Sequence, residues 1–222
     1  LIDQSLINSF ILHCKKHFLF CELHMNYENR QDKLPERTNY ILSLNPDYED
    51  IRRNYKKDLL QNLKKTNTDI LNYEIGQNYQ KVIELYKYQY GKRFPHVTKN
   101  DYQQFSALCF ILLQKGMFLV RNVHDIPEKK LLSAAIFLKD DNRIYNIMPV
   151  TLPEGRERNA QHFLLDQLIK EFSGQKLILD FEGSEIAGIA EFYRKFGSIS
   201  EPYPFLRFNH LPFPFRYLKK NR

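Results

Sequence analysis

The chain has 222 residues, of which 43% are hydrophobic and 27% are charged. This composition is typical of a folded globular protein and excludes a disordered or fibrous one. The formal net charge of +7 favours polyanionic partners such as RNA, nucleotides or cofactor phosphates, although the basic residues also fit the solvated faces of helices. No stretch approaches the ~20 apolar residues that span a bilayer, so we expect no membrane span.

The cysteines and the start of the chain indicate a compartment. Cys14, Cys21 and Cys109 form no CxxC pair, are odd in number and lie in apolar runs, where small buried thiols are common. Together with the lack of a charged-then-apolar leader, they predict a cytoplasmic protein. The chain starts at Leu1, directly in a helical pattern, so we expect further residues to precede it.

The N-terminal part predicts a helix followed by two strands. Apolar residues recur at helical spacing over residues 2–14, and strict alternation over residues 19–27 is typical of a half-buried strand. Residues 40–44 predict a second short strand.

A basic helix is predicted next. Asn45-Pro46 reads as an N-cap followed by proline at the first helical position, and the helix runs to about residue 65. Its expected buried stripe is Tyr48, Ile51, Tyr55, Leu59 and Leu63. The polar residues 66–69 predict a boundary that divides the chain into residues 1–66 and 67–222.

The second part begins with a predicted strand and two helices. Residues 70–75 predict the strand, and the helix after it is expected to end in a left-handed cap at Gly91. The residues from Thr98 to Asp101 form a capping-box pattern that opens the next helix, which Gly116 ends.

Three strands, a helix, a strand, a helix and a strand complete the prediction. The three strands span residues 117–123, 131–139 and 144–150, the last two joined by a hairpin turn at Asp140-Asp141-Asn142. A loop over residues 151–158 leads into a helix ended by Gly174. Then come a strand over residues 176–181, a helix capped by Ser184 and ended at Gly197, and a strand over residues 205–209. The fold class is therefore mixed α/β, or α+β.

This order of elements resembles the GNAT acyltransferase fold. The segments LILDFEGS (residues 177–184) and GIAEFYRKFG (188–197) are similar to bacterial GNAT-like proteins related to the FemAB transferases. The resemblance is specific over residues 37–65 and 131–197, and implies that residues 1–66 are the C-terminal part of an incomplete first GNAT-like half. FemAB-type enzymes transfer amino acids from aminoacyl-tRNA to peptidoglycan precursors.

A strand end and a helix start meet around residue 182. Asp180 and Glu182 follow the strand, and Ser184 opens the next helix, an arrangement that gathers carboxylates and free amides where ligands bind in α/β domains. We expect Glu182 or Asp180 to be a general base, and Tyr193 to protonate the leaving group. In the alternative interpretation, Asp180 and Ser184 only organise the turn and cap the helix.

The resemblance also implies a place for a cofactor phosphate. GNAT enzymes wrap the pyrophosphate of coenzyme A with an Arg/Gln-x-x-Gly-x-Gly/Ala loop, and the matching place here holds Gly155, Arg156, Arg158, Asn159 and Ala160. Matching Arg156 to the leading arginine puts Asn159 and Gln161 at the two small positions, a departure from the pattern. We therefore expect no tightly bound cofactor, with acetyl-CoA or another acyl-CoA as a co-substrate. An exposed Arg-Glu-Arg can equally be solubilising.

Other chemistries find no pattern in the sequence. His13 and His17 stand four residues apart but have no third ligand, so we expect no metal site. There is no GxSxG elbow or phosphate loop of the GxxxxGK[ST] type, and Cys109 lies on an apolar helix face.

The expected function is N-acyl transfer, acetyl or aminoacyl, from acyl-CoA or aminoacyl-tRNA directly to an amine acceptor, with no DNA partner. The alternative is a non-catalytic GNAT-like scaffold that binds an acylated, anionic or RNA partner. Donor, acceptor and oligomeric state stay open at this point.

Overall fold

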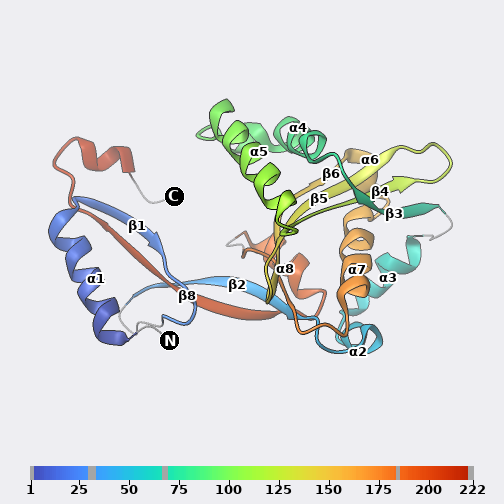
Figure 1. Cartoon of the computed structure of the whole chain (residues 1–222), viewed down its shortest axis with the longest axis horizontal. Coiled ribbons are helices and arrows are strands. Elements are labelled where there is room, and N and C mark those ends of the chain that lie inside the picture. The colour runs from blue at the N-terminus through green and yellow to red at the C-terminus, as the bar shows by residue number, and fades with distance from the viewer. Residues whose placement is uncertain (1–2, 30–33, 67–69, 184–185, 220–222) are drawn as a thin grey trace. The chain divides into compact units, whose positions relative to one another are not determined.

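The computed structural model describes residues 3–29, 34–66, 70–183 and 186–219 (Figure 1). The chain forms two compact units, Leu1–Asn39 with Ser200–Arg222, and Tyr40–Ile199. The boundary predicted between residues 66 and 67 lies within the second unit, and its relation to a first GNAT-like half stays a prediction. No helix in the described ranges is long and apolar enough to cross a membrane.

The first unit is a helix packed on a small group of strands. It contains α1 (Gln4–His17), β1 (Phe20–His24), the start of β2 (Glu36–Ser43), β8 (Ile199–Asn209) and the 3-10 turn η2 (Phe215–Lys219). β1 runs antiparallel to β8, and Ile7 and Ile11 of α1 pack with Leu206 of β8. The predicted helix and first strand are confirmed, whereas β8 begins six residues before the predicted start at Phe205.

The second unit is built on a mixed sheet with the strand order β2-β7-β6-β5-β4-β3. Its strands are the end of β2, β3 (Leu71–Gly76), β4 (Phe118–Asp125), β5 (Leu131–Lys139), β6 (Arg143–Thr151) and β7 (Ile178–Asp180). Successive strands from β3 to β6 are antiparallel, β6 and β7 are parallel, and β2 and β7 are antiparallel. This mixed α+β architecture confirms the predicted fold class.

Helices cover both faces of this sheet (Figure 1). One face carries α4 (Tyr79–Tyr90) and α5 (Lys99–Gln114), with a 3-10 turn at Gly91–Arg93 between them; the other carries α2 (Tyr48–Arg53), α3 (Lys57–Lys65), α7 (Ala160–Phe172) and α8 (Ala187–Arg194). Alternation along β5 supplies both cores, because Ala134 and Ile136 face α4 and α5, whereas Ala135 and Phe137 face α7.

The predicted basic helix is divided into α2 and α3. Asp47, rather than Asn45, is the N-cap of α2. The chain leaves helical geometry near Asn54, and the backbone N–H of Lys56 donates to the carbonyl of Lys195 at 2.9 Å. The predicted buried stripe is confirmed apart from Tyr48, which is only partly buried.

The helix ends show which local signals hold. The capping box is confirmed, because Asp101 Oδ2 accepts the Thr98 N–H at 2.7 Å and Thr98 Oγ1 accepts the Asp101 N–H at 3.3 Å. The left-handed cap at Gly91 is wrong: its φ is −55°, and the chain continues into the 3-10 turn. The predicted cap at Ser184 is also not that of α8, whose N-cap is Ile186; Ser184 itself lies outside the described residues.

The segment predicted as a loop over residues 151–158 contains a short helix, α6 (Pro153–Glu157), with proline in its first turn. Gly155 lies so close to the Leu132 carbonyl of β5 that a Cβ on it would overlap that oxygen. The missing side chain of Gly155 therefore lets α6 pack on the sheet.

We expect Gly155→Ala to lower the free energy of unfolding by about 1–3 kcal/mol, since the added methyl overlaps a backbone atom that cannot rotate away. The matched control is Gly188→Ala in α8, where an added Cβ meets nothing within 4 Å. That change should raise stability by about 0.4–1 kcal/mol. Urea denaturation checks both values, and equal effects of the two substitutions would contradict the packing role of Gly155.

Candidate functional site

The sheet opens between β6 and β7. Their parallel pairing has three residue pairs, Arg143 with Ile178, Ile144 with Leu179 and Tyr145 with Asp180. β7 ends at Asp180, whereas β6 continues to Thr151. Beyond Tyr145, β6 has no strand on this side within the described ranges. Backbone groups of β6 on this side are thus left for a ligand or for side chains.

Asp180 organises the corner at which β7 ends. It is 4% exposed, and its Oδ2 forms an ion pair with Nη1 of Arg143 at 2.7 Å. Its Oδ1 accepts the backbone N–H of Glu182 at 2.8 Å. Glu182 itself has a φ of +61°, in the left-handed region that a non-glycine residue seldom occupies. The turn that ends β7 therefore depends on Asp180.

Glu182 is an exposed residue two positions after the end of β7. Partial desolvation of its carboxyl raises the pKa of Glu182, the charge of Asp180 raises it further, and Arg143 opposes the shift. Tyr193 of α8 packs on the α7 face of the sheet, stacked on Phe181, the residue before Glu182, with ring centroids 4.5 Å apart. Glu182 and Tyr193 are therefore both placed around the end of β7.

The pKa of Tyr193 is raised. Burial raises this pKa to about 12, with further contributions from Tyr86 and then Glu182. Tyr193 packs on the α7 and α8 face, and Tyr86 of α4 packs on the α4 and α5 face. With its raised pKa, Tyr193 keeps its proton at neutral pH, as a proton donor must.

The residues matched to the phosphate loop lie around the start of α7. Asn159 is its N-cap, with a φ of +54°, and Ala160 is its first residue and fully buried. The guanidinium of Arg158 forms ion pairs with Asp125 at the end of β4 and with Glu154. Arg156 lies 5.9 Å from the ring centroid of Tyr90, and Gly155 packs on β5. Several of these side chains thus have structural partners.

Sequence reasoning missed three residues at the opening: Arg143, Tyr86 and Asn146. Arg143 and Tyr86 gave no local signal, because their positions depend on strand register and helix packing. Asn146 did give one, since it is a polar residue in the middle of an otherwise apolar strand prediction.

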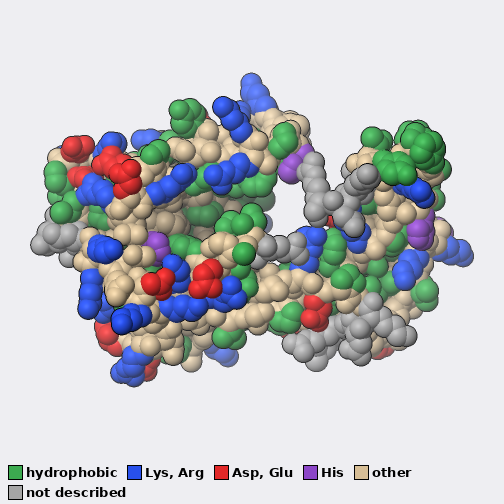
Figure 2. All heavy atoms as spheres, turned by 180° about the vertical axis from the view of Figure 1, so that it is seen from behind, with side chains coloured by type: hydrophobic (Ala, Val, Ile, Leu, Met, Phe, Trp, Pro, Cys, Tyr) green, Lys and Arg blue, Asp and Glu red, His purple; other side chains and the backbone are tan. Residues whose placement is uncertain are grey.

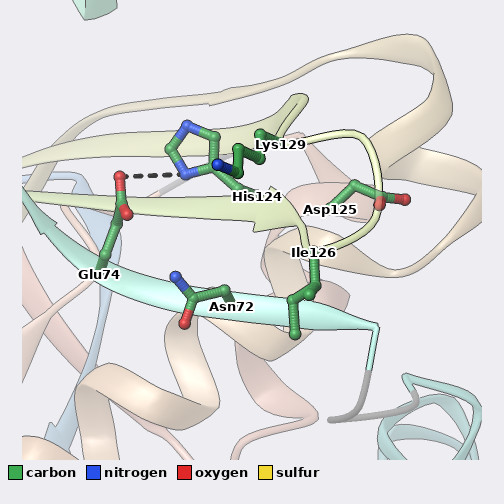
Figure 3. Close-up of a pocket in the computed structure, with 6 residues that line it drawn as sticks. All are labelled: Asn72, Glu74, His124, Asp125, Ile126 and Lys129. Carbon is green, nitrogen blue, oxygen red and sulfur yellow. Dashed lines mark ion pairs between the residues drawn. The ribbon is translucent and has the colours of Figure 1, made fainter.

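A separate pocket lies at the β3 edge of the sheet, beside β3 and β4 (Figure 3). It is lined by Asn72, Glu74, His124, Asp125, Ile126 and Lys129. One of its carboxylates, Asp125, forms an ion pair with Arg158, and Glu74 Oε1 lies 3.1 Å from His124 Nδ1. The Arg158 contact lowers the pKa of Asp125, which suits an ion pair and not a base that works near neutral pH.

The opening is the better candidate site for proton-transfer chemistry. It brings together the sequence-predicted Asp180, Glu182 and Tyr193. Asp180 forms a structural ion pair, and the pKa values of Glu182 and Tyr193 are raised. In the described ranges, no three His, Cys, Asp or Glu residues are grouped to hold a metal ion. A carboxylate and a phenol on either side of a gap in a sheet suit transfer of a group between two bound substrates.

Comparisons with known proteins point to one fold. No protein-family model matches the chain, and no curated protein matches its sequence. The crystal structure of FemX matches with a TM-score of 0.65 and 12% identity, covering 97% of this chain and 79% of FemX. A conserved protein of unknown function from Bacteroides thetaiotaomicron matches with a TM-score of 0.61 and 9% identity, covering 91% and 74% of the two chains.

A third match is a tandem GNAT protein from the clavulanic acid biosynthesis pathway, with a TM-score of 0.50 and 10% identity over 94% of this chain and 70% of that one. At such identities the likeness establishes the fold alone. The chain has the mixed α+β fold of the GNAT proteins, FemX among them.

Proposed function

We propose that this protein transfers an acyl or aminoacyl group from an activated ester or thioester directly to an amine, at the opening between β6 and β7. The observation that carries the proposal is the place of Glu182 at the end of β7, where its backbone N–H donates to Asp180 and where Tyr193 stacks on the adjacent Phe181. The GNAT fold agrees with acyl transfer. No covalent enzyme intermediate is needed.

In this mechanism, the Glu182 carboxylate takes one proton from the bound ammonium, and the neutral amine nitrogen then attacks the carbonyl carbon and releases its second proton to solvent. A base is required because a free amine with a pKa around 10 is mostly protonated at neutral pH. The tetrahedral intermediate then collapses, the bond from carbon to the leaving sulfur or oxygen breaks, and Tyr193 donates its phenolic proton to the leaving group. Proton exchange with solvent restores both side chains.

Positioning supplies much of the rate in such a mechanism. Holding donor and acceptor together can lower the barrier by roughly 7–11 kcal/mol, and amide donors to the developing oxyanion contribute about 3–4 kcal/mol more. Backbone N–H groups of β6 beyond Tyr145 are the candidate donors, because β7 no longer pairs with them. Asp180 acts here as a positioning residue, which holds the backbone of Glu182 in place.

For the donor we favour aminoacyl-tRNA, in the cytoplasm, over acyl-CoA. Gly155 and Arg158 are engaged in packing and ion pairs, which leaves Arg156 as the exposed cation of the phosphate loop. In contrast, Lys and Arg side chains gather over the α2 and α3 end of the second unit (Figure 2). Lys64 and Lys65 are exposed there and take part in no ion pair in the described ranges.

The second candidate function is a non-catalytic scaffold for an acylated, anionic or RNA partner. The observation in its favour is the same engagement of Gly155 and Arg158, which removes two residues from cofactor binding. A scaffold does not depend on an ionisable side chain at residue 182. Substitution of Glu182 therefore distinguishes the two functions.

We expect Glu182→Gln to abolish transfer of an amino acid from charged tRNA to an amine, with donor binding retained, because the amide keeps the size of the side chain and cannot accept the proton. The assay is transfer of a radiolabelled aminoacyl group, with retained fold checked by circular dichroism. The control is Glu157→Gln, an exposed glutamate on α6, which should transfer at the wild-type rate. Equal rates for the two variants would remove Glu182 from the mechanism.

The pH dependence follows from the raised pKa of Glu182. We expect kcat/KM to rise with pH through this raised pKa, because only the carboxylate accepts a proton. Since the folded state also holds this proton more tightly than the unfolded state, stability falls as pH rises from about 4.5 through the folded pKa. Glu182→Gln should therefore be more stable than wild type at pH 7, and the difference should vanish at low pH; urea titrations at several pH values measure it.

Binding of tRNA should weaken steeply with salt. Each phosphate neutralised contributes about 0.7–0.9 to the slope of log K against log salt, so Lys64→Gln/Lys65→Gln should reduce the slope by about 1.4–1.8. The control with the same loss of charge is Lys81→Gln/Lys115→Gln, at exposed positions on α4 and after α5. Filter binding at several salt concentrations gives both slopes, and an unchanged slope for the first pair would exclude this surface as the tRNA contact.

A further inference from the structure

Asn146 is a buried amide whose polar atoms have no partner. It lies on β6 with 3% of its surface exposed, and neither Oδ1 nor Nδ2 has a hydrogen-bonding partner within the described ranges. A buried donor and acceptor left without partners destabilise the folded state, so such a group calls for a ligand or a water molecule.

Asn146 lies beside the residues of the proposed site. It follows Tyr145, which pairs with Asp180, the last residue of β7. The residue after Asp180 is Phe181, on which Tyr193 stacks. Asn146 also pairs with Phe137 of β5, whose side chain packs on the α7 and α8 face. Because paired residues point to the same face, the side chain of Asn146 lies on this face, which also holds Tyr193.

A bulge in β6 fixes the side on which Asn146 lies. Ile136 pairs with Met148 and Phe137 pairs with Asn146, so Ile147 is an extra residue in β6. The extra residue sends Met148 to the α4 and α5 core, although Ile144, four residues earlier, packs on the α7 side. Bulges of this kind re-aim side chains and are common next to active sites.

We infer that Asn146 binds a secondary amide of the substrate. Its Nδ2 donates to the amide carbonyl oxygen and its Oδ1 accepts the amide N–H, so one amide satisfies both orphaned atoms. An ester or thioester carbonyl alone would satisfy only Nδ2. This inference rests on the proposed function and names the substrate group that is bound beside the reacting groups. The amide comes either from the pantetheine arm of a thioester donor or from a peptide acceptor.

The test is calorimetric titration with two probes, D-pantetheine and N-acetylalanine methylamide, which represent the two sources. We expect wild type to bind one of them, Asn146→Leu to bind it at least tenfold more weakly, and Glu182→Gln to bind it like wild type. The probe that binds identifies the source of the amide. Asn146→Leu keeps the size of the side chain and removes both unpaired atoms, so its melting temperature should match or exceed that of wild type.

Two results would overturn the inference: no binding of either probe to wild type, or equal affinity of wild type and Asn146→Leu. If the equal affinity came with a raised melting temperature of Asn146→Leu, the buried amide would be assigned to a water molecule. If Asn146→Leu does not fold, Asn146→Ala is measured against the same criterion. Full loss of transfer in Glu182→Gln with unchanged probe affinity in Asn146→Leu would leave the proposed function standing and reject the amide site alone. Unchanged transfer in Glu182→Gln with weakened probe binding in Asn146→Leu would keep the amide site and reject Glu182 as the base.

Discussion

The chemistry proposed for this chain depends on the early end of β7. Three residue pairs with β6 are enough to hold β7 in the sheet, and the ion pair between Arg143 and Asp180 stabilises its last residue. Asp180 then accepts the N–H of Glu182, which turns the backbone into the left-handed region. A longer β7 would pair with β6 beyond Tyr145 and close the gap. The opening is therefore built from one ion pair and one turn.

The two cores hold the opening from both sides. On one face, α4 and its Tyr86 pack on the sheet, and on the other α8 packs with its Tyr193 stacked on Phe181. α7 is tied to the sheet by a partly buried network in which Nε of the buried Arg121 donates to Glu171 at 2.8 Å and the Tyr73 hydroxyl donates to the same carboxylate. Removing Glu171 would leave the charge of Arg121 buried and unpaired by this carboxylate, so the contact helps to hold α7 on the sheet.

Much of this fold could be predicted from the sequence, because its elements have local signals. The alternation in β4 to β6, the capping box at Thr98 and the glycine after α7 each depend on a few neighbouring residues. The break at Asn54 gave no local signal, and the hydrogen bond that accompanies it joins Lys56 to Lys195, far along the chain. The motif located Glu182 and Tyr193, whereas the place of Arg143 depends on strand register. Asn146 gave a local signal as a polar residue in an apolar strand, but its position next to the site also depends on register.

The state of Glu182 bears on the choice between an enzyme and a scaffold. Partial desolvation and the nearby charge of Asp180 disfavour the ionised form of Glu182, although the residue is exposed, and a φ of +61° adds backbone strain at the same residue. A neutral side chain at this position would avoid the first cost, and a glycine the second. Direct transfer gives a reason for both, because a general base needs a raised pKa and a fixed position beside the reacting amine. The scaffold accounts for the engaged Gly155 and Arg158 but leaves Glu182 without a role, and we therefore favour the enzyme.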